Sequence, residues 1–214
     1  MDNTKYLRSF GRIKSHKLSE NQQDLIQNFL PQIRPNIEKI KNESIWFEIG
    51  FGAGEHLIQL IESRKNNEII IGCEPYINGA VKAIKYIHDN NIDNCFIHDS
   101  DARILIETLP NKSVEKFFIL FPDPWPKKRH HKRRVINSNM IELLYSKLTE
   151  NGLITIATDH EDYAEWIHKI AKDYNYLFKK FTTKSECQTH GILTRYCSKA
   201  LSKNFTINLF LLER

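Results

Sequence analysis

The feature that most constrains the fold is the alternation of short, apolar, β-branched segments with helical segments from about residue 45 onward. Strands are predicted at 44–49, 68–73, 94–100, 114–121, 153–159 and within 203–214. Helices are predicted between them at 55–65, 78–90, 102–109, 138–148 and 161–174, with Asn151-Gly152 ending the fourth. This alternation is typical of an α/β protein with a doubly wound, mostly parallel sheet that helices cover on both faces. We expect the last strand to be antiparallel.

The segment before the first predicted strand differs from the rest of the chain. Residues 19–42 are expected to form one or two helices, broken at Pro31 and Pro35 because proline interrupts helical hydrogen bonding. The length of 214 residues suits one domain. We therefore expect residues 43–214 to form that domain, with residues 1–42 as a basic N-terminal extension whose helix packs on it.

A glycine-rich turn follows the first predicted strand directly. It contains Gly50, Gly52 and Gly54, and a helix begins just after it. Glycines let a backbone turn tightly and approach a ligand, and a helix N-terminus offers free N–H groups. Glu74 closes the second predicted strand, 20 residues after Gly54, where doubly wound sheets place a carboxylate on the hydroxyls of a ribose. The turn therefore predicts a cofactor that contains a nucleoside.

Acidic residues around the turn distinguish between two such cofactors. The dinucleotide fingerprint needs its third glycine at position 55, where this chain has Glu55. Glu48 precedes the turn, and Asp101-Ala102 follow the third predicted strand, where an acid can accept a hydrogen bond from an adenine amino group. Carboxylates repel a pyrophosphate but attract the sulfonium and ammonium of S-adenosylmethionine. The residues therefore favour S-adenosylmethionine over NAD.

The net charge of +5 is concentrated in short segments. Residues 127–134, KKRHHKRR, contain six Lys or Arg, two His and no acid, and without them the chain has 25 basic and 26 acidic residues. Residues 1–18 add five basic residues and one acid. An acidic body that carries two basic segments indicates a polyanionic partner.

A proline-rich segment, FPDPWP, joins the fourth predicted strand to this basic run. Because ligands lie at the carboxyl ends of the strands in doubly wound sheets, Asp123 is expected to face the cofactor crevice. Pro122, Pro124 and Pro126 restrict the backbone around it and stiffen the loop. For Trp125 two roles are open, stacking on a base or packing as a wedge that holds the loop.

These segments resemble the bacterial tRNA (guanine-N7-)-methyltransferase family, in order, over about residues 45–200. The resemblance rests on FEIGFGAGEHL (47–57), GCEPY (72–76), DA (101–102), FPDPWPKKRHHKRR (121–134), TDHEDYAEW (158–166) and a late Thr194. The segment at 121–134 is highly specific, and the glycine turn is less so. The resemblance implies a Rossmann-like methyltransferase that moves a methyl group from S-adenosylmethionine to N7 of a variable-loop guanosine in tRNA.

The resemblance also implies roles for individual residues. The cofactor side of the site comprises Glu48, Glu74, Asp101, Ala102 and Asp123 together with Gly50, Gly52 and Gly54, and Asp123 is also the active-site acid. The tRNA side comprises Lys127, Arg129, His130, His131, Lys132, Arg133, Arg134, Asp159, Thr194 and Cys197. Cys197 stands where the family's T-x-x-E motif has glutamate, so a contact made by that glutamate is absent or relocated.

The chemistry of guanine N7 fits an orienting role for Asp123. N7 carries a lone pair and no proton, so its attack on a methyl group needs alignment and no base. Asp123 is expected to accept hydrogen bonds from guanine N1–H and N2–H and to stabilise the positive charge that develops on the purine. Two alternatives are open: a methyltransferase acting on another RNA purine, and an RNA-binding module without catalysis.

The remaining features give expectations about setting. Cys73, Cys95, Cys187 and Cys197 form no closely spaced pair, which favours reduced thiols in the cytoplasm over disulfides, and no metal site is expected. The chain has no apolar run of about 20 residues and no apolar N-terminal segment, so neither a membrane span nor a secretory signal is expected. The protein is expected to be a monomer or a homodimer.

Overall fold

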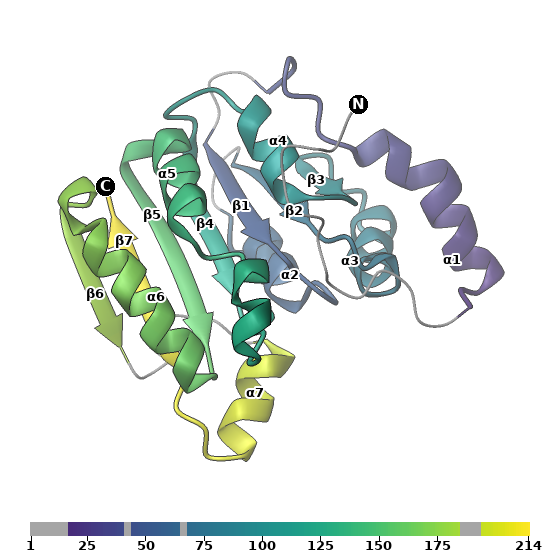
Figure 1. Ribbon diagram of the computed structural model, residues 1–214. Helices are drawn as coiled ribbons and strands as arrows, with labels where there is room; N and C mark the ends of the chain where they lie inside the picture. Colours follow the sequence, from purple (N-terminus) through teal and green to yellow (C-terminus); the bar gives the residue numbers. More distant parts are fainter. Residues whose placement is uncertain (1–16, 41–43, 65–67, 185–193) are drawn as a thin grey trace.

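A seven-stranded sheet forms the centre of the protein in the computed structural model, which describes residues 17–40, 44–64, 68–184 and 194–214 (Figure 1). The strands are β1 (Ile45–Ile49), β2 (Ile69–Cys73), β3 (Cys95–His98), β4 (Val114–Leu120), β5 (Leu148–Thr158), β6 (Lys180–Lys184) and β7 (Asn208–Glu213). They follow the order β3-β2-β1-β4-β5-β7-β6. The first five are mutually parallel, and β7 is antiparallel to both β5 and β6. The predicted fold class, including the antiparallel last strand, is confirmed.

Helices cover both faces of the sheet. One face carries α4 (Ala102–Thr108), α5 (Ser138–Lys147) and α6 (Glu161–Asp173). The other carries α2 (Glu55–Ser63), α3 (Ile77–Asp89) and α7 (Arg195–Ser202). Alternate side chains of one strand serve the two cores, since Phe47 packs with the first set and Trp46 with the second. Burial on both faces explains why the parallel strands read as continuous apolar segments.

The helix before the sheet ends at Pro35 but continues through Pro31. Three consecutive helical segments, α1 (Glu20–Asp24), η1 (Leu25–Phe29) and η2 (Leu30–Ile33), form one run. Pro31 lies in the first turn of η2, where its missing N–H costs no essential helical bond. Arg34 is extended, as expected for a residue before proline. The predicted break at Pro31 is therefore wrong, whereas that at Pro35 is confirmed. Leu30 of this run is buried in the core that includes α3.

The connection between α5 and β5 also differs from the expectation. The helix ends at Lys147 and the strand begins at once, so Asn151 and Gly152 lie inside β5. The pairing with β4 shifts register in this part of the strand. A Cβ at Gly152 would lie 2.6 Å from Leu148 Cγ, so the glycine permits an irregular strand rather than ending a helix. Two short elements, β6 and α7, were not predicted at all.

The glycine turn yields a stability prediction. Gly54 and Gly52 both have left-handed backbones, but a Cβ at Gly54 would lie 2.6 Å from Ala83 Cβ, whereas one at Gly52 would meet nothing within 4 Å. Gly54→Ala should lower the free energy of unfolding by about 2–4 kcal/mol, because backbone strain and a clash add. Gly52→Ala should lower it by about 1–2 kcal/mol, from strain alone. Urea denaturation measures both, and equal losses would contradict the close packing of α2 on α3.

Candidate active site

Three carboxylates gather at the carboxyl ends of β1, β2 and β4. Glu48 lies in β1 and is buried, Glu74 follows β2 and is buried, and Asp123 lies in the loop after β4. Burial raises the pKa of Glu74, and the nearby charges of Asp123 and Glu48 raise it further against two backbone hydrogen bonds. The three carboxylates therefore give this edge of the sheet, called the crevice edge below, a negative charge that favours a cationic ligand.

The glycine turn is fastened to the end of β2 by Glu74. The Gly52 N–H donates to Glu74 Oε2 at 2.8 Å, and the Tyr76 N–H donates to Glu74 Oε1 at 2.8 Å. Each carboxylate oxygen keeps a second lone pair, which can accept from a hydroxyl. A Cβ added at Gly50 or Gly52 would meet no heavy atom within 4 Å, so open space lies beside the turn. These features fit the nucleoside of S-adenosylmethionine.

Glu48 has a neighbour whose role the sequence reading missed. His56, in the first turn of α2, places Nδ1 3.2 Å from Glu48 Oε2, and both side chains are buried. The ring of His56 also meets Phe118 edge-on, with 4.8 Å between ring centroids. The sequence allowed this contact to be predicted, because a helix that starts directly after the turn brings its second residue back toward the end of β1. His56 therefore lies directly against Glu48 beneath the turn, although the two atoms do not form a hydrogen bond.

Asp101 and Ala102 open α4. Asp101 caps the helix, its Oδ1 accepting from the Arg103 N–H at 3.0 Å and from Arg103 Nε at 2.9 Å. The Arg103 guanidinium thus offsets part of the charge expected to face an adenine amino group, while lone pairs of the carboxylate remain. Ala102 is buried in the first turn of the helix.

The loop that carries Asp123 has a strained backbone. Phe121 and Trp125 adopt left-handed conformations, with φ of 51° and 46°, although neither is glycine. Such strain persists only where surrounding contacts impose it, and it is common at functional sites. Asp123 itself is exposed to solvent. Partial burial of its carboxyl group raises its pKa above the usual value. The observed strain supports a loop built to present Asp123.

The basic run forms a short 3-10 helix, η3 (Lys128–Arg133), beside this loop. Lys128, Arg129 and Lys132 of this helix are exposed, and so is Lys127, which precedes it. The imidazole of His130 instead meets Trp125 edge-on, and the Arg133 guanidinium lies 4.9 Å from the same ring. Loss of hydration and the neighbouring cations lower the pKa of His130, which favours its neutral form. Trp125 thus packs within the loop and η3, as the wedge interpretation expects.

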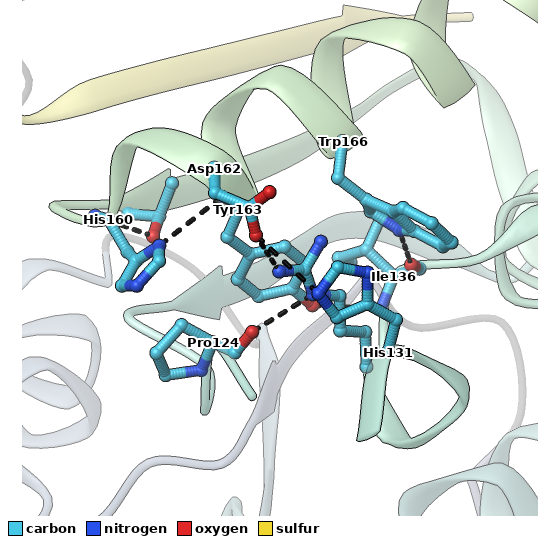
Figure 2. Close-up of polar contacts among 9 residues, drawn as sticks. Pro124, His131, Ile136, His160, Asp162, Tyr163 and Trp166 are labelled. Atoms are coloured by element: carbon cyan, nitrogen blue, oxygen red, sulfur yellow. Dashed lines mark hydrogen bonds and ion pairs between the residues drawn. The ribbon is translucent and has the colours of Figure 1, made fainter. Parts of the chain in front are cut away.

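Arg134 departs from its expected place among the phosphate-binding cations. Its side chain is only 1% exposed, and its guanidinium lies over the rings of Tyr163 and Trp166 of α6. It donates to the Pro124 carbonyl and to Asp162; Figure 2 labels these two partners and the rings of Tyr163 and Trp166. A side chain so buried, whose Nε and one terminal nitrogen already donate within the protein, is not available to a phosphate in this structure. The expectation that Arg134 contacts tRNA phosphate is corrected accordingly.

His131 is also turned toward the protein. Its Nε2 lies 3.7 Å from Asp162 Oδ2, and its ring meets Trp166 edge-on at 5.7 Å between centroids. Figure 2 shows it between Asp162 and the ring of Trp166. Fewer of the basic residues at 127–134 are therefore exposed than the sequence suggests.

The late part of the site is organised by α7. Thr194 caps this helix, its Oγ1 accepting from the Cys197 N–H at 3.0 Å, and Cys197 is 1% exposed. The Cys197 thiol faces the core and not a substrate, which corrects the expected contact. The exposed ring of Tyr196, a residue that the sequence reading missed, stacks on Phe121 with 6.2 Å between centroids. Through this contact α7 lies against the Asp123 loop.

Asp159 lies at the carboxyl end of β5, the strand that pairs in parallel with β4. It follows β5 and lines a groove of about 740 Å³ between α6 and the segment that leads into β7. No group of three His, Cys, Asp or Glu residues in the described ranges is arranged to hold a metal ion. Among the same residues, no helix is both long and apolar enough to cross a membrane.

Solved structures share this fold. An antibiotic-related methyltransferase aligns over 97% of this chain and 98% of its own, with a TM-score of 0.57 and 15% identity. An rRNA methylase from Streptococcus thermophilus aligns over 83% of this chain and 90% of its own, with a TM-score of 0.53 and 14% identity. The fold is that of the Rossmann-like, S-adenosylmethionine-dependent methyltransferases, and Glu48, Glu74 and Asp123 lie at the carboxyl ends of the strands, where ligands bind in such sheets.

Sequence comparisons narrow this class to one family. The model of a family described as putative methyltransferase matches residues 42–209. The tRNA (guanine-N(7)-)-methyltransferase of Wolbachia pipientis wMel is 39% identical over 211 residues, 97% of this chain and 92% of the relative. That of Caulobacter vibrioides (strain NA1000 / CB15N) is 35% identical, over 91% of this chain and 90% of the relative. The chain belongs to the family of the bacterial tRNA (guanine-N7-)-methyltransferases, which confirms the resemblance seen in its motifs.

The coupled carboxylates predict how binding of S-adenosylmethionine depends on pH. The ionised forms attract the cationic ligand, so affinity should fall as pH drops through the raised pKa of Glu74, by about tenfold per unit below that midpoint. Asp123→Asn should move the midpoint to lower pH, because one charge that raises the pKa of Glu74 is gone. Isothermal titration between about pH 4 and pH 7 measures the midpoint.

A matched control is Asp89→Asn, which removes an exposed carboxylate paired with Lys85 on α3. It should leave the midpoint in place. An Asp123→Asn midpoint equal to that of the parent would contradict the coupling between the two carboxylates.

Proposed function

We propose that this protein transfers a methyl group from S-adenosylmethionine to N7 of a variable-loop guanosine in tRNA, in the cytoplasm. The observation that carries the proposal is the position of Asp123, in a stiff loop between the crevice edge and the exposed cations of residues 127–132. The names of the relatives, which are tRNA (guanine-N(7)-)-methyltransferases, support the same reaction. RNA is the polyanion that fits this placement of charge.

The residues of the crevice edge would hold the cofactor, which supplies an electrophilic methyl group when bound. The second lone pairs of Glu74 would accept from ribose hydroxyls, while the open side of Gly50 and Gly52 leaves room for the ligand against the backbone. Asp101 and Ala102 would border the adenine. Glu48, which lies against His56, would contribute negative charge near the cationic end of the ligand.

Asp123 would orient the guanine rather than abstract a proton. N7 needs no deprotonation, so the protein's task is to align the base with the methyl group and to keep it there. A carboxylate that accepts from N1–H and N2–H distinguishes guanine from adenine, which lacks both donors, and it stabilises the positive charge that the product base acquires. The ionised form of Asp123 is the one that does both.

The exposed cations would hold the tRNA by its phosphates. Lys127, Lys128, Arg129 and Lys132 project from η3 and the residue before it, beside the loop that carries Asp123. Such contacts give affinity and position without reading sequence. Asp159 and Thr194 would also belong to the substrate side of the site. Thr194 would contribute by capping the start of α7.

Nucleoside analysis of tRNA after incubation with S-adenosylmethionine tests the reaction. The protein should form 7-methylguanosine, and Asp123→Ala should reduce turnover by about 100-fold or more because orientation and charge stabilisation are lost together. The affinity of the variant for tRNA should change little, since phosphate contacts dominate it. Methylation at another atom would favour a different RNA purine as substrate, and binding of tRNA without methylation would favour a binding module.

Salt dependence tests the phosphate contacts. Replacing Lys128 and Lys132 together by alanine should reduce the slope of log K against log salt by about 1.4–1.8, at roughly 0.7–0.9 per phosphate contact. Lys112→Ala is the matched control, because Lys112 precedes β4 at the amino end of the strands and pairs with Glu150. Filter binding at several salt concentrations gives the slopes. Equal slopes for the double variant and its parent would refute the assignment.

A further inference from the structure

A buried arginine, Arg134, links the Asp123 loop to α6. Arg134 Nε donates to the Pro124 carbonyl at 2.9 Å, and a terminal nitrogen of the same guanidinium donates to the carboxylate of Asp162. The guanidinium carbon lies 4.8 Å from the ring centroid of Tyr163 and 5.2 Å from that of Trp166. A planar cation held by two rings and two acceptors has little freedom to move.

The chain after Arg134 is tied to the same helix. The Ile136 N–H donates to Tyr163 Oη at 3.2 Å, and Trp166 Nε1 donates to the Ile136 carbonyl at 2.8 Å. The hydrogen bond from Arg134 lowers the pKa of Asp162, so the carboxylate is ionised at neutral pH. Arg134 therefore projects from a segment that α6 already holds in place.

The contact with Pro124 bears directly on Asp123. Pro124 is the next residue, and the other end of the loop is pinned where the Phe121 N–H donates to the Ala157 carbonyl at 2.8 Å. Asp123 lies between these two fixed points. The left-handed backbones of Phe121 and Trp125 need such restraints, because each conformation is otherwise unfavourable.

We propose that Arg134 and Asp162 are positioning residues, which set the location of the Asp123 carboxylate by holding the Pro124 carbonyl against α6. The proposal rests on the proposed function for its catalytic consequence, but its mechanical part stands on the contacts alone. It gives the last arginine of the basic run a role different from that of its exposed neighbours. Arg134 acts through the loop and does not touch the substrate.

Two variants test the proposal with a matched control. Asp162→Ala removes the half-exposed partner of Arg134 and leaves the buried guanidinium without a counter-charge, so the unfolding temperature of the variant is measured first. Arg134→Lys keeps the charge but loses the planar fork that reaches Pro124 and Asp162 together. Glu161→Ala removes the neighbouring acid in the first turn of α6 and controls for the effect of charge on the helix.

Hydrogen–deuterium exchange of the peptide 121–136 gives a readout that needs no activity. Exchange should rise in Asp162→Ala and Arg134→Lys and stay at the parent level in Glu161→Ala. In tRNA methylation assays below the unfolding temperature, both variants should lose about 10- to 100-fold in kcat, as expected for a misplaced orienting group. The Kd for tRNA, its salt slope and the KM for S-adenosylmethionine should change by less than about twofold.

The possible outcomes separate the explanations. Unchanged exchange, or raised exchange with unchanged kcat, would overturn the positioning role. A Kd for tRNA that rises by more than about twofold in Arg134→Lys but not in Asp162→Ala would mean that Arg134 contacts the RNA, and it would overturn the proposal. A parent protein that forms no 7-methylguanosine would overturn the proposed function, while the exchange measurement would still decide whether Arg134 holds the loop.

Discussion

The parallel arrangement of β1, β2 and β4 is the constraint on which the site depends. Parallel strands end at the same edge, so residues far apart in the sequence, Glu48, Glu74 and Asp123, meet there. Burial raises the pKa of Glu74, and the charges of Asp123 and Glu48 raise it further. Two backbone N–H groups, those of Gly52 and Tyr76, donate to Glu74 and stabilise its carboxylate against this repulsion. A cationic ligand would relieve it.

The positive charges of residues 127–134 lie beside the three carboxylates and not among them. Exposed lysines and an arginine of residues 127–132 face outward, while Arg134 turns inward and meets Asp162. Residues 127–134 thus have two roles. Their exposed cations can bind a polyanion, and Arg134 stiffens the loop that carries Asp123. The left-handed backbones of Phe121, which precedes a proline, and of Trp125, which lies between two prolines, show how tightly that loop is held.

Much of the fold could be predicted because the parallel strands are buried on both faces. Their continuous apolar segments and the helices between them were read correctly, apart from the ends of some elements. The strand β6, KFTTK, lies at the edge of the sheet and has no apolar run, and α7 is short and polar, so neither left a clear pattern. Pro31 misled because a proline in the first turn of a helix does not break it.

The sequence predicted which residues form the site, but it did not predict which side chains contact one another. The sequence by itself determined the order of the strands and helices, the glycine turn and the carboxylates that follow the strands, because these depend on local pattern and spacing. Only the tertiary structure decided that Arg134 is buried, that Cys197 faces the core and that His56 meets Glu48. The physical reason is that a side chain's direction is set by its packing against distant elements, such as α6, which no local pattern encodes.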